Sequence, residues 1–157
     1  PQPVGEKPVV IGAKDWEGTW LHEDGALTMK VVDSEKGILK VAWVESKDNE
    51  LEFESAEGYL RASGEWMFGN VKDKDDSGNV LYLWCRVKKD NGQVTIWFPD
   101  VEKFRDLVSK GKLPGKVEGD NVILSDLQPE AMKIITSSAE GLLFDWENPI
   151  ILIRVLK

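Results

Sequence analysis

Few side chains in this sequence have the chemistry and spacing that catalysis requires. His22 is the only histidine, so a metal site built from several histidines is excluded. A Ser–His–Asp triad would have to use His22, but the Gly-x-Ser-x-Gly turn that presents the serine of many hydrolases is absent. An enzyme would then depend on two converging carboxylates, and no motif brings candidates such as Glu65 and Asp145 together. We predict a protein without catalytic residues.

Two acidic segments are the remaining candidates for a chemical role. Residues 73–78, Asp-Lys-Asp-Asp-Ser-Gly, match the start of a calcium-binding loop. The twelfth position holds Trp84 where such a loop needs a bidentate glutamate, so we predict a charged turn, with weak cation binding as the alternative. In residues 50–54 three glutamates alternate with Leu51 and Phe53, which predicts a strand with its carboxylates in solvent and its apolar side chains inside. We expect neither a metal nor a cofactor.

The composition is that of one globular domain. Of the 157 residues, 41% are hydrophobic and 31% are charged, which is enough for a domain with its own core. The formal net charge of −8 argues against nucleic acid and anionic membranes as partners, because both require clustered lysine and arginine. Cys85 is the only cysteine, so no internal disulfide forms. The seven tryptophans suit a core, a ligand pocket or an interface.

Short alternating segments separated by turn residues predict strands along most of the chain. These segments are 15–22, 25–33, 38–45, 50–54, 59–62, 65–72, 80–89, 93–98, 142–147 and 149–157, with one strand or two short ones in 116–124. Asn91-Gly92 favours a tight hairpin. Helical spacing predicts helices over 99–111 and 126–138. The predicted fold is mainly β: a single antiparallel up-and-down β-barrel of about eight to ten strands, with two short α-helices inserted before the last two strands.

The aromatic residues are the best candidates for a binding site. On the predicted inward faces lie Trp16, Trp20, Trp43, Phe53, Trp66 and Phe68. We predict that a small hydrophobic ligand contacts all of these except Trp20, namely Trp16, Trp43, Phe53, Trp66 and Phe68. The alternative is that they fill the barrel and leave no space for a ligand. Tyr82, Trp84 and Trp97 belong to the opposite face, where we expect a helix or a partner to cover them.

Two features of the first and last strands resemble a known family. Gly18-Thr19-Trp20 opens the first core strand and Arg154 lies in the last, which resembles the Gly-x-Trp and C-terminal arginine pattern of lipocalins and the wider calycin group. The resemblance implies a cup-shaped, eight-stranded barrel that binds small apolar molecules. It also implies that Gly18, Trp20 and Arg154 close the barrel, with the guanidinium packed over the indole in a cation–π contact.

Residues 1–13 and 14–157 are expected to differ in character. The first segment begins Pro-Gln-Pro-Val-Gly-Glu-Lys-Pro, which has the composition of a flexible tether, and the second forms the barrel domain. Because the chain begins with Pro1 and not Met, we expect an upstream membrane anchor or signal peptide. That expectation places the protein in the cell envelope or periplasm, lipid-anchored, with a cytoplasmic protein as the alternative.

Two functions remain open on the sequence. The first is a non-catalytic cell-envelope binding protein that holds a small hydrophobic ligand in a lipocalin-like barrel. The second is a protein-interaction or structural lipoprotein module, with a side-chain-filled barrel and another envelope protein as its partner. In both, the protein meets the membrane only through its lost anchor, and no nucleic acid is involved.

Overall fold

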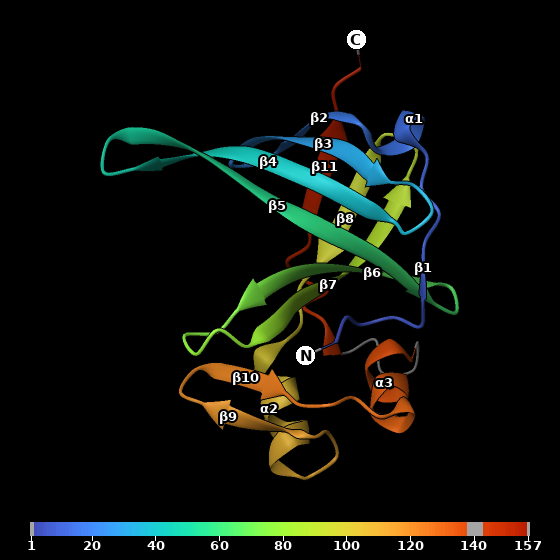
Figure 1. The fold of residues 1–157 in the computed structure, drawn as a ribbon, viewed down its shortest axis with the longest axis vertical. Helices are drawn as coiled ribbons and strands as arrows, with labels where there is room; N and C mark the ends of the chain where they lie inside the picture. The colour runs from blue at the N-terminus through green and yellow to red at the C-terminus, as the bar shows by residue number, and fades with distance from the viewer. Residues whose placement is uncertain (1, 138–142, 157) are drawn as a thin grey trace.

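Eight strands of the chain close into one barrel (Figure 1). The computed structural model describes residues 2–137 and 143–156. The barrel strands are β2 (Gly18–His22), β3 (Gly25–Asp33), β4 (Ile38–Lys47), β5 (Glu50–Ser63), β6 (Trp66–Lys74), β7 (Val80–Asp90), β8 (Gln93–Trp97) and β11 (Ile150–Arg154). Successive strands pair antiparallel, and β11 completes the circle between β8 and β2. The predicted mainly β, up-and-down barrel is confirmed.

The chemistry of the turns holds the hairpins in register. Asn91, at a positive φ of 39°, begins the two-residue turn between β7 and β8, as the Asn-Gly pair predicts. Asp48 and Asn49, at φ of 51° and 65°, form the corresponding turn between β4 and β5. Asp and Asn enter this left-handed region at lower cost than most side chains do. Both hairpins therefore turn without loop residues that would loosen the pairing.

A second layer is inserted between β8 and β11. It consists of α2 (Val101–Ser109), β9 (Gly115–Glu118), β10 (Asn121–Leu124) and α3 (Pro129–Thr136). Asp100 starts α2 by accepting hydrogen bonds from the backbone N–H groups of Glu102 and Lys103, which satisfies two donors that have no partner within the helix. The two predicted helices are confirmed, and β9 and β10 form a hairpin between them.

The strand predicted at 142–147 is wrong over its described residues, 143–147. Phe144 makes only an isolated bridge with Pro99, and residue 142 lies outside the described residues. Leu143 and Phe144 are 5% and 1% exposed, so consecutive side chains are both buried, which an alternating strand at a one-sided surface does not allow. The segment instead packs as an irregular connection against the second layer.

The barrel wall has apolar contacts on both sides. The inner core lies inside the barrel and includes Trp16, Trp20, Leu39, Leu60, Val94 and Leu152. The outer core lies between the barrel and the second layer and includes Phe68, Phe104, Leu113, Ile135, Leu143 and Phe144. Along β7, Val87 belongs to the inner core, whereas Trp84 contacts Phe104 and Phe144 outside. The predicted helix cover is confirmed for Trp84, whereas Trp97 contacts Trp146 in the connection before β11 and Tyr82 contacts Tyr59 of β5.

The N-terminal segment, predicted as a flexible tether over residues 1–13, is docked on the barrel in its described part. Val4 is fully buried, and its N–H donates to Asn70 Oδ1 at 2.7 Å. β1 (Lys7–Pro8) pairs with the end of β5, and Arg61 donates to the carbonyl of Gly5. Proline-rich composition indicated a tether, but one valine in the outer core and a few backbone hydrogen bonds are enough to fix the segment.

Cys85 provides a test of the filled barrel. Burial raises the pKa of its thiol to about 12, because the thiolate would lose its hydration. We expect iodoacetamide at pH 8.5 to leave the folded protein unmodified and to alkylate it in urea, as read by intact mass. A Ser46→Cys variant, with its new thiol at an exposed position of β4, should gain one adduct while folded. Equal reactivity of both thiols in the folded variant would contradict a closed core.

Candidate functional site

The seam between β2 and β11 closes one end of the barrel. Arg154 places its guanidinium carbon 5.9 Å from the centre of the Trp20 ring and donates hydrogen bonds to the carbonyls of Lys14 and Glu17. Lys14 belongs to α1 (Ala13–Trp16), a short helix that lies before β2. A single arginine therefore joins the last strand, the first barrel strand and the helix before it. This is the barrel-closing arrangement that the Gly-x-Trp resemblance implies.

Gly18 and Trp20 complete that seam. Gly18 lies beside Arg154 and has a φ of +131°, a backbone conformation that residues with a side chain rarely adopt, so the backbone here favours glycine. Trp20 is fully buried and donates its indole N–H to the carbonyl of Trp16 at 2.9 Å. The buried indole thus keeps its one polar group hydrogen-bonded, which makes these residues structural.

The five residues predicted to line a ligand site are not brought together. Trp16 is 5% exposed and belongs to the inner core. Trp66 and Phe68 face the opposite side of the wall and pack in the outer core, so their predicted inward orientation is wrong. Phe53 is 72% exposed and its inward orientation is also wrong. Of the five, Trp43 alone is placed both on the inward face and beside solvent.

An apolar layer at the other end of the barrel was missed by the sequence analysis. It contains one inward-facing side chain from each of six strands, and we call it the rim layer: Leu27, Trp43, Val71, Leu83, Ile96 and Ile150. Their orientation follows from the register, since Leu83 pairs with Val71 and precedes the inner-core residue Cys85 by two positions. Leu83 is 61% exposed and Ile150 is 38% exposed. The barrel is therefore filled at one end and apolar but open to solvent at the other.

The glutamates of residues 50–54 face the opposite side from the one predicted. Trp43 pairs with Glu54, and Val44 pairs with Phe53. Because cross-strand partners share a face, Glu54 lies on the inward side with Trp43, whereas Phe53 lies on the outward side with Val44. The alternation was predicted correctly and its direction was not. A single-residue offset along a strand exchanges the two faces completely.

Arg86 is an unexpected buried charge in the outer core. It is 2% exposed, and its Nε and Nη2 atoms have no hydrogen-bond partner within the described residues. Its guanidinium lies over the ring of Trp66 and 4.6 Å from the centre of the Trp146 ring. Loss of hydration lowers the pKa of Arg86 to about 10. Within the described chain, the faces of these two indoles are the groups that interact with its charge.

The other predicted polar groups serve local structure. In the charged turn at 73–78, the Asp75 carboxylate accepts hydrogen bonds from the backbone N–H groups of Ser77 and Asn79 and from the Asn79 side chain. The Asn79 side-chain hydrogen bond is the main reason that the pKa of Asp75 is lowered. His22 Nδ1 accepts from the backbone of Asp24 in the turn after β2.

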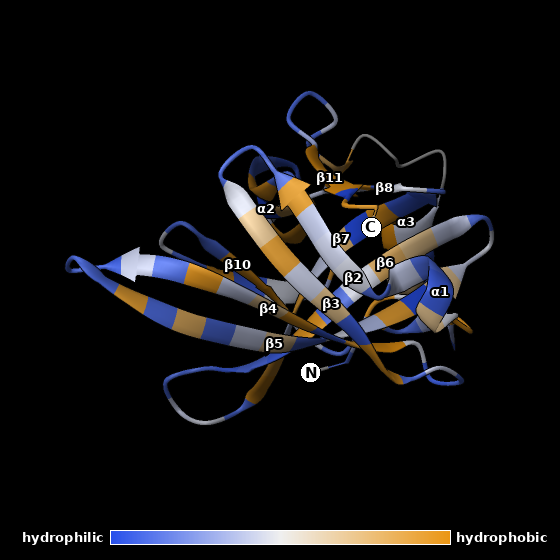
Figure 2. Ribbon diagram, turned by 90° about the horizontal axis from the view of Figure 1, so that it is seen from above, coloured by the Kyte–Doolittle hydropathy of each residue, from blue (hydrophilic) through white to orange (hydrophobic). Residues whose placement is uncertain are grey.

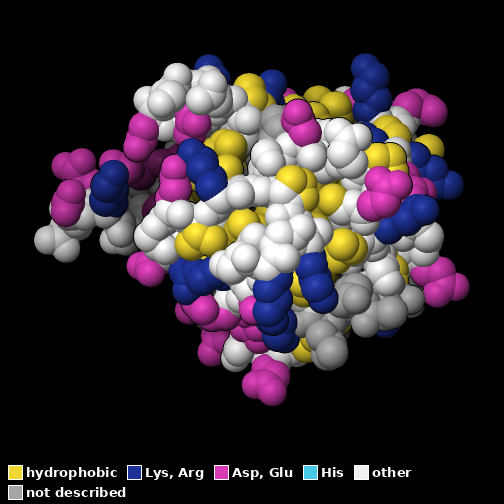
Figure 3. Space-filling model, turned by 90° about the horizontal axis from the view of Figure 1, so that it is seen from below, with side chains coloured by type: hydrophobic (Ala, Val, Ile, Leu, Met, Phe, Trp, Pro, Cys, Tyr) yellow, Lys and Arg dark blue, Asp and Glu magenta, His cyan; other side chains and the backbone are white. Residues whose placement is uncertain are grey.

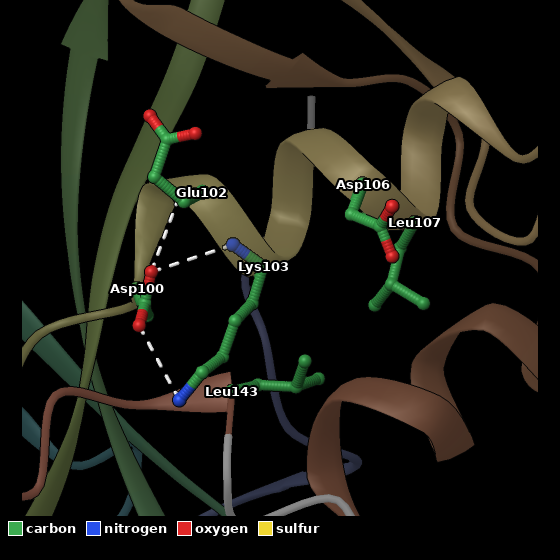
Figure 4. A pocket seen from close by; sticks show the side chains of 6 residues that line it. All are labelled: Asp100, Glu102, Lys103, Asp106, Leu107 and Leu143. Atoms are coloured by element: carbon green, nitrogen blue, oxygen red, sulfur yellow. Dashed lines mark hydrogen bonds and ion pairs between the residues drawn. The ribbon is translucent and has the colours of Figure 1, made fainter.

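Two surface pockets lie outside the barrel. The first, of about 440 Å³, runs along α2, where Asp100 both caps the helix and forms an ion pair with Lys103 at 3.3 Å (Figure 4). The second, of about 500 Å³, lies beside Trp66 and α3, and Glu65 lines it. Asp145 does not line either pocket and accepts a hydrogen bond from the side chain of Asn148. Neither pocket brings Glu65 and Asp145 together.

On the face seen in Figure 3, acidic and basic side chains are interspersed among small apolar areas.

Comparison with known proteins adds no relative. No family model matches the chain, and no match is found among curated proteins or solved structures. The geometry itself defines the class: an eight-stranded antiparallel barrel consistent with a calycin-like fold.

Within the described residues, no helix has the length and apolar character needed to cross a membrane. No group of three or more potential metal ligands is found in the same residues.

Removal of the Arg154 side chain should weaken the barrel. We expect Arg154→Met to lower the free energy of unfolding by about 2–4 kcal/mol, because two charge-assisted hydrogen bonds and the contact with Trp20 are lost. Lys36→Met is the control: it breaks an exposed ion pair with Asp33 and should cost less than about 1 kcal/mol. Urea unfolding followed by tryptophan fluorescence measures both. Equal small losses would show that the seam does not depend on the guanidinium.

Replacement of Arg86 tests whether its charge serves stability. We expect Arg86→Met to unfold at the same or a higher urea concentration, because the apolar side chain fills the space without two unpaired buried donors. Arg86→Ala should lose about 2–5 kcal/mol, because it leaves a cavity between two indoles. If both variants lose the same stability, the charge itself is stabilising and this interpretation is wrong.

Proposed function

We propose that this protein is a non-catalytic binding protein and that the rim layer holds a small apolar molecule. The observation that carries the proposal is the exposure of Leu83 and Ile150 on the inward face of the barrel. Inward positions of a closed barrel are normally filled. Where apolar groups at such positions are exposed to solvent, a ligand that covers them gains about 25 cal/mol of binding free energy for each Å² of apolar surface buried.

The form of the barrel limits the ligand. The inner core occupies the closed end, where Trp16, Trp20 and Leu152 are at most 5% exposed. A ligand therefore rests on the inner core and contacts the rim layer without passing along the whole barrel. Trp43 is the one aromatic side chain of the rim layer, and its indole N–H is already bonded to Glu45 at 2.8 Å. Recognition by shape and apolar contact, rather than by many hydrogen bonds, follows from this lining.

The likeness to lipocalins is part of the proposal. It is supported by the filled end beneath α1, by the Trp20–Arg154 contact and by the open apolar end opposite. The cell envelope remains the proposed location, and the net charge of −8 keeps a domain there in solution. Cell fractionation with an antibody against the barrel tests the location separately.

A second candidate function is a protein-interaction module with a filled barrel. It is favoured by an apolar area on the outward face of the seam, where Leu21 pairs with Ile153 and both are about half exposed. Ile151, 45% exposed, extends this area along β11. Such contiguous exposed apolar side chains are typical of protein contacts. Under this function the rim layer binds nothing.

Binding of a neutral apolar dye decides between the two. We expect N-phenyl-1-naphthylamine to gain fluorescence with the protein and medium-chain alcohols to displace it. Leu83→Asp should weaken dye binding at least about tenfold, which corresponds to 1.4 kcal/mol, because it places a charge in the rim layer. Leu51→Asp is the matched control, since Leu51 is also exposed, at 78% against 61% for Leu83, but faces outward. No dye binding, or equal loss in both variants, would exclude the rim layer.

A further inference from the structure

The hairpin of β4 and β5 extends beyond the barrel and has an open edge. β5 pairs with β4 from Glu50 to Tyr59, but with β6 only from Gly58 to Ser63. Residues 50–57 therefore have a strand partner on one side alone within the described chain. Figures 1 and 2 show this part of the hairpin projecting to the left, away from the other strands. We call residues 44–57 the arm.

The open edge of the arm is a backbone surface ready for another strand. Alternate residues of 50–57 direct their N–H and C=O groups to β4 and the others direct them outward. Within the described chain, the outward groups make no backbone hydrogen bond to another segment. Exposed edges of this length usually accept a further strand unless charge, proline or a bulge prevents it. Proline is absent from residues 44–57, and their register with β4 is continuous.

The inward face of the arm is acidic: Glu45, Glu50, Glu52 and Glu54 lie on it, with Lys47 as its one basic residue. Glu45 lies directly opposite Glu52, and Glu54 lies opposite Trp43. Like charges at directly opposed positions destabilise a strand pair, and no ion pair within the described residues involves Glu45, Glu52 or Glu54. A cationic side chain placed between them would relieve this repulsion.

The outward face of the arm carries an apolar area that is exposed to solvent. Val44, Leu51 and Phe53 are 57%, 78% and 72% exposed. Val44 and Phe53 are cross-strand partners, so they form one continuous apolar surface beside the open edge. In Figure 2, hydrophobic and hydrophilic bands alternate along this part of β5. The arm therefore offers an acidic face, an apolar face and an unpaired edge between them.

We propose that the arm binds an extended segment of a partner protein in which Lys or Arg alternates with apolar residues. The segment adds to residues 50–57 as a new strand. Because its side chains alternate between faces, its basic residues lie beside Glu52 and Glu54 while its apolar residues lie beside Leu51 and Phe53. Backbone hydrogen bonds supply the binding energy of such strand addition, and the alternating side chains supply its specificity.

Charge selects this partner over a second copy of the chain. If two arms paired edge to edge, each would bring its own glutamates against those of the other, and each chain carries a net charge of −8. Opposed like charges keep open edges from self-association. The same carboxylates attract a basic segment and raise its association rate at low salt. The carboxylates thus disfavour a second copy of the chain and favour a basic partner segment.

A synthetic peptide tests the proposal. The probe is an acetylated, amidated octapeptide of alternating Lys and Val, titrated into the ¹⁵N-labelled full chain at low salt. We expect the largest amide shifts at residues 50–57 and slowed amide exchange there. A peptide of the same composition with its lysines contiguous should bind at least tenfold more weakly. Two further peptides carry N-methyl groups on either all the Lys or all the Val residues. Because the N–H groups of alternate residues point to opposite edges of a strand, only one of these two peptides should lose binding. Equal binding of all four peptides would overturn strand addition.

Variants of the arm separate binding from folding. Glu52→Lys should weaken the alternating peptide at least tenfold and leave the urea midpoint unchanged or higher, because it replaces a repulsive pair with Glu45 by an attractive one. Glu35→Lys makes the same charge change in the exposed turn between β3 and β4 and should alter affinity less than twofold. An equal loss of peptide affinity in both variants would mean that net charge alone attracts the peptide, and it would overturn the proposal. A concentration-dependent dimer in which the amides of residues 50–57 are protected without peptide would also overturn it.

The rim layer and the arm are tested independently. Leu83→Asp should leave peptide binding within twofold of the parent protein, because Leu83 belongs to β7 and faces the barrel interior. Leu51→Asp should weaken the peptide severalfold and leave dye binding unchanged. Loss of peptide binding in Leu83→Asp but not in Leu51→Asp would assign the peptide to the rim layer and overturn the proposal for the arm.

Discussion

The pairing of β11 with both β2 and β8 is the constraint on which the structure depends. Without it, β2 and β8 would each present an open edge, and the inner core would lose Leu152. β11 spans only Ile150–Arg154, so few backbone hydrogen bonds are available to hold it. Arg154 adds side-chain hydrogen bonds to α1 and to Glu17, the residue before β2. One side chain thus supports a closure that five residues of backbone would support weakly.

That closure also fixes the second layer. The layer is inserted between β8 and β11, so both of its ends are anchored in the barrel. Its apolar side chains cover the outward face of β6–β8, where Phe68 and Trp84 would otherwise be wet. Loop closure costs entropy that grows only slowly with length, which makes a long insertion tolerable when it buries this much aromatic surface. The result is a wall whose two faces are both core along β6 and β7.

Strand periodicity predicted much of the fold, and its limits explain the errors. Alternation, turn residues and helical spacing predicted the closed barrel, the Asn91 hairpin and both inserted helices. Alternation alone does not tell which face is inside when both faces are apolar, and Trp66 and Phe68 were therefore assigned to the wrong side of the wall. Only the tertiary contact with α2 and α3 settles that choice. The candidate site was less predictable than the fold, because it depends on which faces remain wet.

The arm shows a different limit of sequence reasoning. In residues 50–54 the hydrophobic pattern favours Phe53 inside, but β5 is continuous with Leu60 in the inner core, and the two-residue period then places Phe53 outside. Tertiary structure has overridden a clear local pattern. Conflicts of this kind between local preference and global fold are expected where function, rather than stability, has selected the residues. The exposed phenylalanine and the opposed glutamates both lie where the strands separate, whereas the opposite end holds the filled core. The closed end of the barrel is thus well packed, whereas the open end has exposed apolar side chains and an unpaired strand edge. Binding of another molecule would gain the most free energy at the open end.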